Sequence, residues 1–315
     1  MNFQNGMAQA LDPLRLRLLV EVERRGSISA AADACRIGQP SATKHLKTLE
    51  GAVGEPLLRR EGRGSTLTDA GRVVADHASQ MLGSLAAMED ELRALRGGET
   101  GVLTLAASTT PGTYVLPSVL KCFAERHPGV DVTMSIGPSA EVMRQVATRE
   151  VQLGIAGEIQ AVPTVAVEPF LDDELVGIVA PGTFAAEDVR AEELAGHTLL
   201  VRERGSSTRA TADRHLSAAG VRPAKTWELD SNEAIKRAVA AGLGVGFVSR
   251  LVVEDELEQG RLSSFRIAGG ATPSRPIQLL RAHDRHLTPS ERAFITTLTD
   301  CCDATVPACV VDMPA

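Results

Sequence analysis

Apolar residues near the N-terminus recur every three or four positions, a spacing that predicts short amphipathic helices. The first helix is marked by four of them: Leu14, Leu18, Leu19 and Val22. Gly26 ends this helix, and the Ser27 hydroxyl can cap a second one over Ser29–Ala34. Pro40 then opens a third helix, because proline is tolerated in the first turn. The apolar stripe of this third helix is Ala42, Leu46, Leu49 and Val53.

A small hairpin, or wing, and one long helix follow. Two short extended runs flank a glycine-bearing turn between Leu57 and Thr68, and Thr68 can cap a helix that reaches about Arg96. The apolar residues of this long helix are Val74, Ala78, Met81, Leu85, Met88, Leu92 and Leu95. After Ala78 their spacing alternates between three and four, which is typical of a helix that pairs with another helix. We therefore expect the chain to form a dimer through it.

The pattern changes after a glycine-rich hinge, Gly97–Gly101, to strands that alternate with helices. The expected strands are Val102–Ala107, Val130–Ile136, Leu153–Ala156, Glu174–Ala180, Thr198–Val201, Thr226–Leu229, Val245–Val248 and Ile277–Arg281. The expected helices are Val115–Arg126, Ala140–Arg149, Arg209–Ala219, Asn232–Ala241 and Pro289–Leu298. Thr288 and Glu291 form a capping box for the last helix, and a loose tail is expected from Asp303 onward. This alternation indicates an α/β fold, long enough for two lobes.

Charge divides the chain in the same way as the apolar pattern. Residues 12–66 carry ten Lys and Arg against seven Asp and Glu, a net charge of +3, so the other residues carry −10 of the total of −7. A basic N-terminal part on an acidic remainder indicates that only the N-terminal part meets phosphate. With neither a signal-peptide pattern nor an apolar run of membrane-spanning length, the expected location is the cytoplasm.

The cysteine and histidine pattern favours neither a metal site nor a disulfide framework. Five cysteines are present, without a CxxC pair and without a His/Cys cluster at zinc-ligand spacing: Cys35, Cys122, Cys301, Cys302 and Cys309. We expect reduced structural thiols, although a redox role for Cys301 and Cys302 stays open. We expect no metal and no cofactor.

The second and third helices fit a helix-turn-helix, in which the N-terminal residues of the second element reach base edges in the major groove. Gln39 can bond to adenine in a bidentate manner, and Lys44 can reach guanine or phosphate. Serines at the start of the bracing helix can hold a phosphate with its backbone amides. The candidate DNA-binding residues are Ser27, Ser29, Gln39, Pro40, Ser41, Thr43, Lys44, Lys47, Arg60 and Arg63. Each alone could simply be a solvated surface residue.

Taken together, the N-terminal residues resemble the LysR-type transcriptional regulators. The matching runs are Gly26-Ser27-Ile28-Ser29-x-Ala31-Ala32, Gln39-Pro40-Ser41, Pro56-Leu57-Leu58-Arg59-Arg60, Gly62-Arg63-Gly64 and Leu67-Thr68-x-Ala70-Gly71. Lys44 stands where the family often has arginine, which leaves the base preference open. The resemblance extends over nearly the whole chain. It implies an all-α winged helix-turn-helix with a long linker helix, followed by a two-lobed α/β domain resembling the periplasmic-binding-protein fold.

This resemblance implies a small effector bound in the cleft between the lobes. Hydroxyl groups and amides at strand ends and helix N-termini suit an anion. The candidate effector-binding residues are Ser108, Thr109, Thr110, Arg202, Ser206, Ser207, Thr208, Ser231, Asn232 and Glu233. Turn and capping chemistry is the alternative role for several of them. The runs around Ser108, Pro169 and Asn232 look most like the branch that includes regulators of sulfur assimilation, which suggests a small sulfur oxyanion, with a small organic acid as the alternative.

We therefore expect a DNA-binding domain over residues 1–68, a linker helix over 69–97 and an effector-binding domain over 98–315. Lobe I would span about 98–168 and 272–302, and lobe II about 169–271. The expected function is that of an effector-controlled transcriptional regulator that binds double-stranded DNA as a dimer, or as a tetramer of two dimers. The alternative is a cytoplasmic solute-binding protein without direct gene regulation. An enzyme is not expected, because the chain lacks GxSxG, P-loop and HExxH motifs.

Overall fold

The computed structural model describes residues 11–61, 64–95, 101–283 and 287–305. The chain divides into two compact units. The first unit comprises Met1–Arg96 with Thr148–Glu150, and the second comprises Gly97–Ala147 with Val151–Ala315. The predicted winged domain and linker helix thus share the first unit, while the predicted bounds at 68 and 97 stay predictions.

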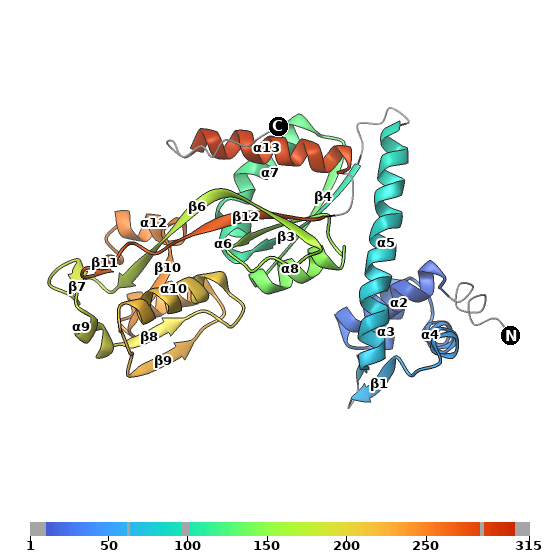
Figure 1. Cartoon of the computed structure of the whole chain (residues 1–315), viewed down its shortest axis with the longest axis horizontal. Coiled ribbons are helices and arrows are strands. Elements are labelled where there is room, and N and C mark those ends of the chain that lie inside the picture. Colours follow the sequence, from blue (N-terminus) through green and yellow to red (C-terminus); the bar gives the residue numbers. More distant parts are fainter. Residues whose placement is uncertain (1–10, 62–63, 96–100, 284–286, 306–315) are drawn as a thin grey trace. The chain divides into compact units, whose positions relative to one another are not determined.

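The first unit contains the predicted succession of helices and wing (Figure 1). Its elements are α2 (Pro13–Arg25), α3 (Ile28–Ala34), α4 (Gln39–Val53), β1 (Leu58–Glu61), β2 (Gly64–Leu67) and α5 (Asp69–Leu95). Gly26 ends α2 with a left-handed φ of 69°, which glycine adopts without steric cost. The Ser27 hydroxyl accepts a hydrogen bond from the Ala30 amide at 3.2 Å, so the predicted cap of α3 is confirmed.

The apolar faces of these helices pack into one core, and polar contacts fix the wing beside it. Leu18, Leu19 and Leu49 are completely buried. Glu50 on α4 accepts hydrogen bonds from the backbone amides of Leu57 and Leu58, at 2.9 and 3.2 Å. These contacts set the direction in which β1 leaves the core, so the wing has a defined position relative to α4.

Helix α5 begins inside this core and continues with an exposed apolar stripe. Ala75 and Ala78 are buried, whereas the next apolar residues along the predicted stripe are 40–50% exposed: Met81, Leu85, Met88 and Leu92. The side chain of Leu95 lies outside the described residues. A helix with this much apolar surface in water gains stability when a second helix covers the stripe.

In the second unit, ten strands of the described chain form one sheet. Lobe I contains β3 (Gly101–Ser108), β4 (Val130–Gly137) and β5 (Leu153–Gly157), with α6 (Thr109–Tyr114), α7 (Leu116–Arg126), α8 (Ser139–Ala147) and α13 (Pro289–Thr305). Lobe II contains β7 (Asp188–Val189), β8 (Thr198–Val201), β9 (Lys225–Glu228), β10 (Val245–Ser249) and β11 (Ser263–Ile267), with α9 (Ala191–Ala195), α10 (Ser207–Ala218), α11 (Asn232–Ala240) and α12 (Arg250–Glu258).

Two long strands connect the lobes: β6 (Val165–Val179) and β12 (Ser274–Ala282). The main strand order is β4-β3-β5-β12-β6-β10-β8-β9. The two strands pair with each other in antiparallel fashion; β12 also pairs with β5 of lobe I, and the last residues of β6 pair with β10 of lobe II. Figure 1 shows both strands running from one lobe to the other. The predicted lobe boundary at residue 169 falls inside β6.

Two predicted elements are markedly longer than expected, and several elements were not predicted. Strand β6 begins at Val165 rather than Glu174, because a register shift between β6 and β12 accommodates Pro169, a residue that ordinarily interrupts a strand. Helix α6 was not predicted, since Pro111 and Gly112 are poor helix formers. Helix α12 and strand β11 were not predicted. Helix α13 continues to Thr305, so the chain is still helical where the tail was expected.

The predicted cap of the last helix is confirmed. The Thr288 amide donates to the Glu291 carboxylate at 2.7 Å, and the Glu291 amide donates to the Thr288 hydroxyl at 3.3 Å, which is a complete capping box. The four cysteines among the described residues are free thiols, while Cys309 lies outside them. In the described segments, no helix combines the length and the apolar character needed to cross a membrane.

Candidate functional site

Helix α4 presents a polar face that no other part of its unit covers. Ala42, Leu46 and Leu49 are buried, whereas the predicted DNA-binding residues of this helix lie on its other side. Gln39, Pro40, Ser41, Lys44 and Lys47 are exposed, and Thr43 is half-buried. Among the described residues, the side chains of Lys44 and Lys47 form no hydrogen bond or ion pair. Their ammonium groups are therefore available to an external anion.

The remaining DNA-binding candidates lie around this helix. Ser29 is exposed on α3, and Arg60 is exposed on β1 of the wing. Ser27 is half-buried, and its hydroxyl is used for the helix cap. Thr43 donates its hydroxyl to the Gln39 carbonyl at 3.0 Å, on its own helix. Arg63 lies outside the described residues.

The second unit holds a narrow hollow, with a cavity volume of about 10 Å³, where lobe I meets lobe II. Hydroxyl side chains line it: Ser108, Thr109, Thr110 and Ser139 from lobe I, and Ser206, Ser207 and Thr208 from lobe II. Six of these seven were predicted for the effector site; Ser139, the first residue of α8, was not. The predictions found the other six because each follows a buried strand or opens a helix.

Some of these hydroxyl groups already contact one another or the backbone. Ser139 donates to Ser207 across the lobes, at 3.2 Å between the two Oγ atoms. Ser108 Oγ accepts from the Gly157 amide at 3.2 Å. Within the described residues, the hydroxyls of Ser206 and Thr208 form no side-chain hydrogen bond, although both residues are buried. These two hydroxyls are free to bind a ligand.

Arg202, the first residue after β8, extends from lobe II to lobe I. Its side chain is 3% exposed, and its guanidinium donates to Thr109 Oγ1 at 3.2 Å and to Asn232 Oδ1 at 2.6 Å. Nε and Nη2 also donate to the two carboxylate oxygens of Glu203, at 2.7 and 2.9 Å. Arg202 and Thr109 were both predicted, whereas the role of Glu203 was not.

A second buried arginine, Arg275 on β12, was missed by the sequence reasoning. Its guanidinium donates to Asp173 Oδ2 from Nε at 3.0 Å and from Nη2 at 2.8 Å, and it also contacts Ser207 and Thr110. Burial lowers the pKa of this guanidinium, and the Asp173 carboxylate opposes that shift. Gly157 leaves room for it, because a Cβ there would lie 3.0 Å from Nη1. Arg275 therefore touches both lobes from a strand that connects them.

Three predicted effector residues do not line the hollow. The Ser231 hydroxyl caps α11 by accepting from the Ala234 amide at 3.3 Å. The Glu233 carboxylate is directed to Arg237 at 2.7 Å and Lys236 at 3.2 Å, on its own helix. Within the described part of the chain, Asn232 reaches the site through Arg202, and its buried Nδ2 has no hydrogen-bond partner there. Ser231 thus acts as a helix cap, and Glu233 takes part in ion pairs on its own helix.

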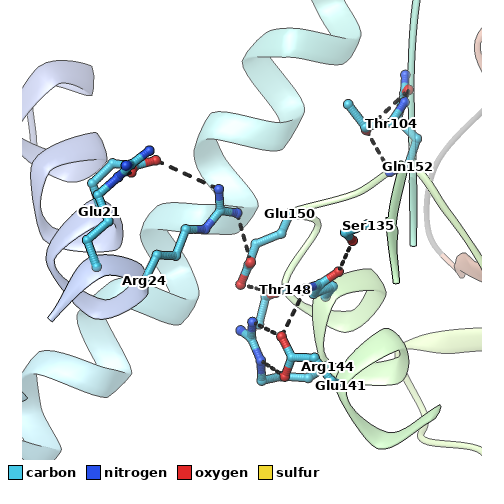
Figure 2. A network of polar contacts seen from close by, with 11 residues as sticks. Glu21, Arg24, Thr104, Ser135, Glu141, Arg144, Thr148, Glu150 and Gln152 are labelled. Carbon is cyan, nitrogen blue, oxygen red and sulfur yellow. Dashed lines mark hydrogen bonds and ion pairs between the residues drawn. The ribbon is translucent and has the colours of Figure 1, made fainter. Parts of the chain in front are cut away.

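Helix α8 carries Ser139, and a set of polar contacts holds this helix and its neighbouring strands (Figure 2). Gln145 and Ser135 bond through their side chains at 3.1 Å, which ties α8 to β4. The Thr104 amide donates to Gln152 at 2.7 Å and the Gln152 amide donates to Thr104 at 3.1 Å, which ties β3 to the start of β5. The first of these contacts holds α8, whose first residue Ser139 lines the hollow, against the sheet of lobe I.

Nothing in the site resembles a metal centre. Over the segments that the structure describes, no group of three or more His, Cys, Asp or Glu side chains could hold a metal ion. The lining consists instead of hydroxyl groups and two guanidiniums whose charges are balanced by Asp173 and Glu203. Such a lining offers an oxyanion several hydrogen-bond donors, but the charge of a bound oxyanion would have no unpaired counter-charge in the hollow.

Comparison with known families accounts for both units. Residues 14–72 match the family described as bacterial regulatory helix-turn-helix protein, lysR family, and residues 96–303 match the LysR substrate binding domain. The Escherichia coli (strain K12) HTH-type transcriptional regulator YeiE is 33% identical over 298 residues, which cover 93% of this chain and 98% of YeiE.

Solved structures show the same fold. A full-length OxyR variant from Pseudomonas aeruginosa superposes with a TM-score of 0.68 at 22% identity, over 92% of this chain and 94% of OxyR. The regulatory domain of CcmR from Synechocystis PCC6803, in complex with 2-PG, gives a TM-score of 0.60 at 25% identity, over 65% of this chain and 99% of that domain.

These matches exclude the alternatives of a solute-binding protein without gene regulation and of an enzyme. The exposed face of α4 belongs to a DNA-binding helix-turn-helix, and the hollow belongs to an effector-binding domain. The chain is a member of the LysR family of DNA-binding transcriptional regulators.

Proposed function

We propose that a small oxyanion binds in the hollow between lobes I and II and thereby controls how the winged domains engage DNA. The observation that carries this proposal is the lining: seven hydroxyl side chains and two almost fully buried guanidiniums around a cavity of about 10 Å³. This volume is far below the roughly 300–1,000 Å³ of usual small-molecule pockets and holds about one water. We propose that a sulfur oxyanion or a small organic acid enters as the lobes move apart; CcmR, a relative in fold, was solved with 2-PG.

The residues that we propose for the effector are those that line the hollow or hold its arginines. They are Ser108, Thr109, Thr110, Ser139, Arg202, Ser206, Ser207, Thr208, Asn232 and Arg275. Because contacts such as Ser139–Ser207 and Arg202–Thr109 join the two lobes, a ligand that inserts between these groups would change the angle between the lobes. The effector would then shift the population between two arrangements of the assembly.

We propose that the DNA contacts come from the exposed face of α4 together with Ser29 and Arg60. The exposed stripe of α5 would pair two chains, and two such dimers would form a tetramer that places winged domains on a two-fold-related site. Because its target is chromosomal DNA, we propose that the protein acts in the cytoplasm. DNase footprinting on the chain's own upstream region, with and without the anions named below, tests this arrangement.

Binding of anions to the full-length chain tests the effector site. Isothermal titration calorimetry would compare sulfate, thiosulfate and 2-PG with chloride at matched ionic strength. The double variant Ser206→Ala/Thr208→Val removes the two free hydroxyls and should weaken the binding of the preferred anion by about tenfold or more. Ser217→Ala, on the exposed side of α10, is the matched control. A wild-type chain that binds none of these anions, or a double variant with unchanged affinity, would contradict the proposal.

A further inference from the structure

The guanidinium edge of Arg202 that faces Glu203 is already occupied by a carboxylate of the same chain. Nε lies 2.7 Å from one oxygen of Glu203 and Nη2 lies 2.9 Å from the other. This is the paired arrangement in which arginine binds an external carboxylate or other oxyanion. Glu203 therefore fills, within the hollow itself, the position that the oxygens of an anionic ligand would take.

The surroundings of Arg202 contain a polar group that still lacks a partner. Asn232 is 3% exposed and accepts from Arg202 Nη1 through Oδ1, while its buried Nδ2 finds no acceptor among the residues that the structure describes. A buried amide donor without an acceptor is unfavourable, and such groups are rare in native proteins. The Glu203 carboxylate thus satisfies Arg202 but leaves the neighbouring amide unsatisfied, which is the signature of a site that lacks one acceptor.

Glu203 is placed so that it can leave while Arg202 stays. Arg202 directly follows Val201, the last residue of β8, and its carbonyl accepts a hydrogen bond from Arg209 Nη1 at 2.9 Å. Glu203 begins the turn that follows, in which Gly205 adopts a φ of 87°. The Glu203 side chain is 19% exposed against 3% for Arg202. A rotation of Glu203 toward solvent would free the Nε and Nη2 donors without moving the strand.

We propose that Glu203 is an internal competitor that occupies the anion-binding edge of Arg202 and that the effector displaces. The effector is then an oxyanion with two adjacent unprotonated oxygens, such as a carboxylate or a sulfate, because it must replace both hydrogen bonds of Glu203. This inference rests on the proposed function of the hollow. It adds that the affinity for the effector is set low by the chain itself, so that only an elevated concentration of the anion triggers the response.

A merely structural Glu203, which orients Arg202 for the ligand, predicts the opposite outcome. Glu203→Gln retains the size of the side chain and removes its charge. If Glu203 competes with the ligand, this variant binds an oxyanion more tightly, by about tenfold for the loss of one charged competitor. If Glu203 orients Arg202, the variant binds the anion more weakly.

Sulfate titrated into the full-length chain by calorimetry, with chloride at matched ionic strength as the blank, distinguishes the two roles. We expect tighter sulfate binding in Glu203→Gln, weaker binding in Arg202→Lys, which lacks the paired donors, and unchanged binding in Glu187→Gln. Glu187 is a fitting control because it is an exposed carboxylate paired with Arg266 at 3.7 Å in the same lobe. Thermal unfolding of each variant in sulfate would give a second, independent measure of the same ranking.

Equal or weaker sulfate binding in Glu203→Gln overturns the inference, and so does a Glu203→Gln variant to which sulfate does not bind at all. Neither result removes the proposed function, because the wild-type chain can still bind thiosulfate or 2-PG in the hollow. Failure of the proposed function has a different signature, in which neither the wild-type chain nor any variant binds any of the three anions.

Discussion

The guanidinium of Arg275 lies against the carboxylate of Asp173, at 2.8 Å between Nη2 and Oδ2, and the two side chains are 2% and 0% exposed. Ser249 donates its hydroxyl to the other oxygen of Asp173. The pair joins β12 to β6, the two strands that connect the lobes, and its arginine also contacts Thr110 of lobe I and Ser207 of lobe II. One buried charge pair thus links the two strands that connect the lobes to both sides of the proposed effector site.

Removal of one partner of this pair should destabilise the second unit strongly. Asp173→Asn leaves the Arg275 charge buried without its counter-charge, and we expect a loss of about 3–5 kcal/mol in the free energy of unfolding. Replacement of both residues, as Arg275→Met with Asp173→Leu, should restore most of this stability. Anion binding should be lost in this double variant, because one of the two guanidiniums of the hollow is removed. Urea unfolding followed by circular dichroism measures the first effect, and anion titration the second. A single variant as stable as the wild type would show that water reaches the pair.

The face of α4 should control sequence-specific DNA binding. Lys44→Ala and Gln39→Ala each remove an exposed side chain without a partner inside the protein, so folding should be unaffected while operator binding loses about 1–3 kcal/mol. Lys121→Ala, an exposed lysine on α7, is the matched control. Gel-shift titrations on operator and random DNA at several salt concentrations separate loss of base contacts from loss of phosphate contacts. Unchanged operator affinity in both variants would remove α4 from the interface.

The apolar stripe of α5 should hold the dimer. Leu85→Glu places a charge in the middle of the stripe, and we expect the assembly to dissociate toward monomers and to lose affinity for the operator. Ala86→Glu introduces the same charge next to it, on an exposed position outside the stripe, and should leave the assembly intact. Light scattering after size-exclusion chromatography measures the mass of each variant. A dimer in Leu85→Glu with wild-type stability would place the interface elsewhere.

The capping box of α13 should contribute to the stability of lobe I. Thr288→Ala removes the hydroxyl that accepts from the Glu291 amide, and we expect a loss of about 1 kcal/mol, within the range measured for helix N-caps. Thr296→Ala is the control, because its hydroxyl only bonds back to the Arg292 carbonyl on its own helix. Thermal unfolding of the full-length chain compares the two. A larger effect from Thr296→Ala would mean that the box is not what fixes this helix end.

Sequence reasoning succeeded where the determinants are local. The helices of the first unit follow from apolar spacing and from caps such as Ser27, and the hydroxyls of the hollow follow from strand ends such as Ser108. It failed for Arg275 and Asp173, which pair across 102 positions. The residues next to each of them in sequence do not indicate that its charged side chain is buried. Asp173 also lies in the first part of β6, which was not predicted as strand because Pro169 is accommodated only through pairing with β12. Glu233 was predicted to bind the effector, but its carboxylate pairs with Lys236 and Arg237 on its own helix and does not line the hollow.

The position of β12 in the sheet has a consequence for how the protein matures. This strand lies between β5 and β6, yet it is translated more than ninety positions after β6 has begun. While lobe II is still being synthesised, β5 and β6 lack the strand that lies between them. Asp173 at that stage has no Arg275 to pair with. Contacts this distant in sequence form slowly. A nascent chain thus has no complete sensing site until residue 275 has emerged, although its winged domain, which needs only local contacts, can fold well before.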